Sequence, residues 1–127
     1  MQKKILRPPY LITDKDGSSV YRIPLAGTEL QARMHPEDWH KLIDSGITPN
    51  WYLNKGGVSY SRRIGKTVRV DRVARAMLGI TDSQSFVRFH DKNPLNLRRE
   101  NLYVYTVKTP AERDRAMSRK TFHRMSR

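Results

Sequence analysis

Alternating apolar and polar residues predict the first elements of the chain. Two short runs, 10–13 and 20–23, flank a polar stretch that contains an Asp-Gly pair, which predicts a β-hairpin with a tight turn. Pro24 lies late in the second run and indicates an edge position, because proline donates no hydrogen bond to a neighbouring strand. Residues 30–34 predict a third short strand.

A short amphipathic helix follows. The sequence His-Pro-Glu-Asp at 35–38 predicts its start, because proline fits the first helical position and acidic residues in the first turn are favoured by the helix dipole. Trp39, Leu42 and Ile43 then share one apolar face, and Gly46 ends the helix.

Runs 51–53, 58–63 and 67–70 are separated by glycine-containing turns and predict a three-stranded antiparallel meander. A second short helix that ends at Gly79 is predicted after it. The meander carries four basic residues: Arg62, Arg63, Lys66 and Arg69. They belong either to a nucleic-acid-binding face or to a solvated edge where charge deters aggregation, and both interpretations stay open.

The segment 87–106 predicts a strand, a polar loop and a second strand, because apolar residues alternate at both of its ends. Thr109-Pro110-Ala111-Glu112 is a capping box that predicts a final helix. The helix is basic, and it either contacts DNA or continues as a flexible tail. Its candidate DNA-binding residues are Arg113, Arg115, Arg119 and Lys120.

These elements predict an α+β fold in one small unit, since 127 residues support little more. We expect a basic N-terminal arm at 1–9, a sheet-and-helix region at 10–80, and a strand-loop-strand-helix region at 81–127.

Charge is the most informative feature of the composition. The chain has 25 Lys and Arg against 12 Asp and Glu, a net charge of +13, which favours a polyanionic partner such as nucleic acid. It has no cysteine, so disulfides and thiolate metal sites are excluded. No apolar run is long enough to span a membrane, so we expect a cytoplasmic protein without a membrane partner.

The strand-loop-strand segment resembles the core of the HNH (His-Me finger, ββα-metal) endonucleases of phages and mobile introns. The resemblance is carried by Asn-Pro-Leu-Asn at 93–96 and Arg-Arg-Glu-Asn-Leu at 98–102. Upstream, segments 33–39, 51–55 and 69–73 stand in the order of a region that often precedes the HNH core. That region is similar to the plant APETALA-type DNA-binding domain, whose three-stranded sheet lies in the major groove.

The resemblance implies a Mg²⁺-dependent site with a histidine general base. In this chain, however, Arg88 stands at the metal-ligand position and Phe89 at the position of the base, whereas the motif-forming Asn96 and Asn101 are retained. Arginine opposes a cation and phenylalanine accepts no proton, so the resemblance implies a degenerate scaffold that binds double-stranded DNA without a metal cofactor. Arg88 then contacts a phosphate.

Two alternatives remain open. A one-residue shift of the loop would place His90 at the position of the base and give an active Mg²⁺-dependent nickase or homing endonuclease; otherwise His90 is a surface residue. The basic face could also dock on an acidic host protein, which the protein would inhibit. Arg98 and Arg99 flank the loop, where they either contact the DNA backbone or pair with Glu100.

Overall fold

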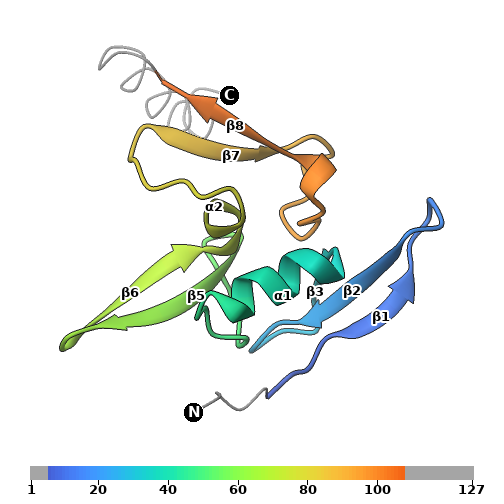
Figure 1. Cartoon of the computed structure of the whole chain (residues 1–127), viewed down its shortest axis with the longest axis horizontal. Coiled ribbons are helices and arrows are strands. Elements are labelled where there is room, and N and C mark those ends of the chain that lie inside the picture. Colours follow the sequence, from blue (N-terminus) through green and yellow to red (C-terminus); the bar gives the residue numbers. More distant parts are fainter. Residues whose placement is uncertain (1–5, 108–127) are drawn as a thin grey trace, which may run out of the picture.

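The computed structural model describes residues 6–107, which form small antiparallel sheets and short helices (Figure 1). The predicted α+β class is therefore confirmed. In the part of the chain that is described, no helix is long and apolar enough to cross a membrane. The predicted capping box and final helix lie outside the described residues.

The first sheet has the order β1-β2-β3, with β1 at Tyr10–Thr13, β2 at Ser19–Pro24 and β3 at Gln31–Met34. The hairpin and the third strand were both predicted. The edge position expected from Pro24 was wrong, because β2 is the central strand. Leu25 N–H donates to Leu30 O on the β3 side of β2, so the preceding Pro24 nitrogen points to the other side, where the pairing with β1 has already ended at Tyr10, the first residue of β1.

The predicted first helix is α1 (Pro36–Asp44), which starts after His35 and has two acidic residues in its first turn. Its apolar face buries Trp39 and Leu42. The Trp39 ring packs against the fully buried Trp51, with ring centroids 5.0 Å apart.

The meander is the second sheet, with the order β4-β5-β6. Strand β4 spans Tyr52–Asn54, β5 spans Gly57–Ile64 and β6 spans Thr67–Arg72. The short helix α2 (Val73–Met77) follows directly and packs against β5 and β6. This order and the turns agree with the sequence-based prediction.

The segment predicted as strand, loop and strand contains β7 (Ser85–Phe89), the 3₁₀ turn η1 (Arg99–Asn101) and β8 (Leu102–Thr106). The loop between β7 and η1 docks on the first sheet. Arg33 N–H donates to Leu95 O, and Leu97 N–H donates back to Arg33 O. The loop thus pairs alongside β3 through a parallel bridge between Arg33 and Asn96, and it places the buried Leu97 in the core.

One hydrophobic cluster takes residues from both expected regions, 10–80 and 81–127. Val87 and Phe89 of β7 are partly buried against it. The described elements therefore share a single core rather than two. The largest fully buried side chains of this cluster are Ile23, Leu25, Met34, Trp51, Val73 and Leu97.

Candidate nucleic-acid interface

The outer half of the β5–β6 hairpin extends away from the core as a two-stranded ribbon (Figure 1). We call residues 62–70 the ribbon. Every residue of the ribbon is exposed, whereas 58–60, at the inner end of β5, are buried. All four basic residues predicted on the meander lie on the ribbon.

The register of the ribbon places these cations on both of its faces. Arg62 lies opposite Arg69, so these two share one face, whereas Arg63 lies opposite Val68 on the other face. Lys66 lies in the turn between the strands. Both faces and the tip of the ribbon are therefore positively charged.

Within the part of the chain that is described, Arg62 is the one cation of these four that forms an ion pair. Arg62 Nε lies 2.6 Å from Asp71 Oδ2 at the base of the ribbon. Arg63, Lys66 and Arg69 have no ion-pair partner within residues 6–107. Three charges are thus available to an anionic partner.

A second candidate surface lies on the outer face of the β7–β8 hairpin. Arg88 is exposed, and its Cζ lies 4.4 Å from the centre of the Tyr105 ring, a cation–π contact. His90 is also exposed, and its ring stacks on Tyr103 with centroids 4.5 Å apart. Arg88 thus has the exposed position that contact with a phosphate requires.

Phe89 points to the opposite side of this hairpin and packs against the core. The side chain that stands at the position of the catalytic base is therefore turned away from His90. Among the described residues, no group of three or more His, Cys, Asp and Glu side chains is arranged to hold a metal ion.

The loop that resembles the HNH motif is held together by Asn101, which is buried. Its side-chain oxygen accepts from Asp91 N–H at 3.0 Å, and its amide donates to Asp91 Oδ1 at 2.9 Å and to Asn96 O at 3.0 Å. The Asn96 amide in turn donates to Asp91 Oδ2 at 2.8 Å. Both asparagines therefore have the loop-forming role that the resemblance implies, and both oxygens of Asp91 are occupied.

Arg98 differs from the expectation that it contacts the DNA backbone. Its guanidinium lies 2.7 Å from Asp14, 2.5 Å from Asp16 and 2.6 Å from Glu100. Pairing with Glu100, the alternative, is confirmed, and the Arg98 side chain is only 12% exposed. Three carboxylates neutralise this cation, so it is not available to a phosphate.

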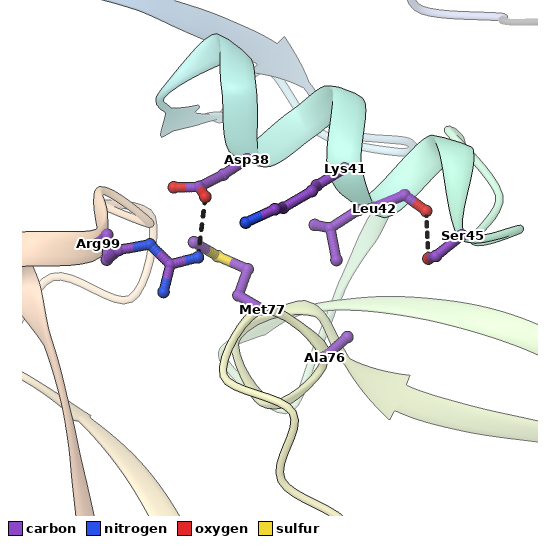
Figure 2. A pocket seen from close by; sticks show the side chains of 7 residues that line it. All are labelled: Asp38, Lys41, Leu42, Ser45, Ala76, Met77 and Arg99. Atoms are coloured by element: carbon purple, nitrogen blue, oxygen red, sulfur yellow. Dashed lines mark hydrogen bonds and ion pairs between the residues drawn. The ribbon is translucent and has the colours of Figure 1, made fainter.

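Arg99 is also paired. Its Nη2 lies 2.9 Å from Oδ1 of Asp38, a buried carboxylate on α1. Figure 2 shows this pair at one side of a hollow between α1 and α2, which Lys41, Leu42 and Met77 also line. This ion pair therefore links η1 to α1, although about half of the Arg99 side chain is exposed.

The ion pairs around Arg98 lower the pKa values of its carboxylate partners. Burial raises the pKa of Asp14, but the Lys15 N–H and the charges of Arg33 and Arg98 outweigh it, so the pKa of Asp14 lies below its ordinary value. A hydrogen bond from Arg98 holds the pKa of Asp16 far below its usual range. The folded structure therefore favours the ionised form of these carboxylates.

Acid is expected to weaken the fold. The folded-state pKa of Asp14 lies below the unfolded value of about 4, so its stabilisation is complete above that value and is lost as the pH falls towards the folded pKa. Burial raises the pKa of Asp91, but hydrogen bonds from Asn96, Asn93 and Asn101 lower it by more, so this pKa also lies below its ordinary value. Protonation of Asp91 at low pH therefore adds to the loss of stability. Urea unfolding from neutral pH down to about pH 3 should show a falling free energy of unfolding below about pH 5. A constant free energy over this range would contradict the network.

Arg113, Arg115, Arg119 and Lys120, expected on the final helix, lie outside the described residues. Sequence reasoning missed Asp14 and Asp16 as partners of Arg98, and Arg33 as the second cation on Asp14, because nothing local links residues this far apart in the chain. It also missed the rings of Tyr103 and Tyr105 as part of a surface. There the signal was present, since residues two apart on a strand share a face.

Comparison with known proteins identifies no relative: no family model, no curated protein and no solved structure matches the chain.

Proposed function

We propose that this protein binds double-stranded DNA without cutting it, on a degenerate HNH endonuclease scaffold. The observation that carries the proposal is the ribbon, a projecting β-hairpin with cations on both faces and at its tip. The proposed setting is a phage, in which the protein regulates DNA or interferes with nucleic-acid enzymes of the host.

The dimensions of DNA suit this element. The major groove, about 12 Å wide, admits a two-stranded β-ribbon. A ribbon inside the groove has a phosphate backbone on each side, and cations on both faces match that arrangement. The exposed Val68 and Val70 lie beside the cations and offer apolar contact to thymine methyl groups.

The absence of cleavage is proposed on chemical grounds. Phe89, at the position of the base, accepts no proton and packs on the core. Arg88 repels a cation at the metal-ligand position. Both carboxylate oxygens of Asp91 accept hydrogen bonds within the loop, and its N–H donates to Asn101. These features favour binding over metal-dependent hydrolysis.

The first test removes the three unpaired cations of the ribbon. We expect the Arg63→Ala/Lys66→Ala/Arg69→Ala variant to bind duplex DNA roughly 30-fold more weakly at physiological salt. Each phosphate contact releases counterions from the DNA, and this favourable release is lost with the contact. The slope of log K against log salt should fall by about 2 to 3. Fluorescence anisotropy of a labelled duplex, measured across a salt series, gives both quantities.

A matched variant has the same charge change elsewhere. Lys15, Arg22 and Lys41 are exposed and lie outside the ribbon. Their triple alanine variant should keep most of the affinity and of the salt slope. If both variants lost affinity equally, the ribbon would have no special role and net charge alone would account for binding.

The alternatives make different predictions. Incubation of a labelled duplex with Mg²⁺ should leave it intact; cleavage that His90→Ala abolishes would establish the nickase and overturn the proposal. If the protein had no salt-sensitive affinity for duplex DNA, inhibition of an acidic host protein would become the favoured function.

A further inference from the structure

The outer face of β7–β8 has a feature that duplex binding does not require. We call Phe86, Arg88, His90, Tyr103 and Tyr105 the ring row, because the register places these planar side chains on one face of the hairpin. Two contacts order it: the Arg88 guanidinium over Tyr105, and the His90 ring on Tyr103.

The two tyrosines of the ring row contribute nothing to the core. Tyr103 is 40% exposed and Tyr105 36% exposed, and neither belongs to the hydrophobic cluster. Their hydroxyl groups have no hydrogen-bond partner in the part of the chain that the structure describes. Apolar contact with the core is made from the opposite face, by Phe89 and Leu102.

The charge of the ring row complements an anion. Neither β7 nor β8 contains an acidic residue, and Arg88 provides a fixed positive charge between the rings. Its stacking on Tyr105 holds the guanidinium in place beside an aromatic surface. A ligand that offers both flat rings and negative charge therefore fits this face.

We propose that the ring row binds a single-stranded stretch of DNA by stacking its unpaired bases. Sheet faces that display aromatic side chains bind single strands in this way, and a base stacks on any ring regardless of sequence. The choice of DNA over RNA rests on the proposed duplex binding; the stacking itself does not. The protein then binds a duplex through the ribbon and unpaired bases through the ring row.

The spacing of the ring row agrees with an unstacked strand. Tyr103 and Tyr105 are two residues apart on β8, and such residues are separated by about 6.7 Å. This is about twice the 3.4 Å rise of a strand within duplex DNA. Consecutive bases can therefore reach consecutive rings only after they leave the duplex stack, so the ring row selects unpaired bases.

The test uses a short single-stranded oligodeoxynucleotide that contains the fluorescent base 2-aminopurine. Binding to the full chain should quench its fluorescence, because stacking on a ring quenches this base. The Tyr103→Leu/Tyr105→Leu variant should bind it roughly tenfold more weakly and without quenching, as expected for lost base–aromatic stacking. Tyr103→Phe/Tyr105→Phe should retain both properties, since the rings are kept.

The controls separate this proposal from duplex binding. The leucine variant should keep its affinity for a blunt duplex, whereas the ribbon variant should lose duplex affinity and keep the quenching. Circular dichroism melting verifies that each variant folds. Unchanged single-strand affinity in the leucine variant, or tighter binding of an RNA of the same sequence, would overturn the assignment. Failure of duplex binding alone would leave the quenching result intact, so the two proposals fail separately.

Discussion

Replacing Arg98 with methionine is expected to lower the free energy of unfolding by roughly 3 kcal/mol, because the substitution removes one of the two cations that compensate the buried charge of Asp14. The Asp14 side chain is only 5% exposed, and two guanidinium groups hold its carboxylate. Without Arg98, only Arg33 remains, at 3.1 and 3.3 Å from the two oxygens. Methionine keeps the volume of the side-chain stem, so the loss reports on charge rather than packing. Urea unfolding at neutral pH measures it.

Two further variants sharpen this expectation. Arg63→Met makes the same change at an exposed position without an ion-pair partner within the described residues, and it should alter stability by less than about 0.5 kcal/mol. Adding Asp14→Asn to Arg98→Met removes the buried charge that has lost one of its two cationic partners, and it should recover part of the loss. If Arg98→Met cost no more than Arg63→Met, the cluster would not stabilise the fold.

Arg98 also separates a structural from a binding role. Its guanidinium is neutralised by three carboxylates, so its removal should leave the salt slope of duplex binding unchanged as long as the variant is folded. A slope that fell by about one would instead assign Arg98 to a phosphate contact.

Replacing Asn101 with alanine is expected to lower the free energy of unfolding by about 3 kcal/mol. The buried amide makes three hydrogen bonds, each with a net contribution of about 1 kcal/mol, and alanine leaves Asp91 N–H without its acceptor. The loop that it closes also docks on β3, so loss of the amide loosens the contact between the first sheet and β7–β8. Urea unfolding gives the magnitude, and amide hydrogen exchange should localise the loosening to residues 91–101.

Asn93→Ala is the matched control. The Asn93 side chain is partly exposed and accepts a hydrogen bond from Leu95 N–H, so its loss should cost only about 1 kcal/mol. Asn101→Asp keeps the shape but replaces the donor by an oxygen that faces Asp91, and it should destabilise at least as much as alanine. Equal effects of Asn93→Ala and Asn101→Ala would show that burial of Asn101 is unimportant.

Local pattern was sufficient for the order of the elements. Strand alternation, the start of α1 at Pro36 and the glycine turns depend on neighbouring residues, and each was placed within a few positions. Gly17 and Gly65 show why, since both adopt positive φ angles, 87° and 61°, that most other residues avoid. The candidate ribbon cations were found for the same reason, because they lie close together in a recognisable hairpin.

The sequence by itself thus determined the α+β class, the strand order along the chain and the placement of four basic residues on a predicted hairpin. Tertiary structure alone decided that Arg98 is neutralised, because Asp14 and Asp16 are more than 80 positions away and no periodicity links them to it. It also decided that the loop docks on β3 and that Arg88 lies over Tyr105, since both depend on the register between separate strands. From the sequence, Arg98 and Arg99 were expected either to contact the DNA backbone or to pair with Glu100. In the folded protein they pair with carboxylates, and the loop before them joins β3 of the first sheet to β7–β8.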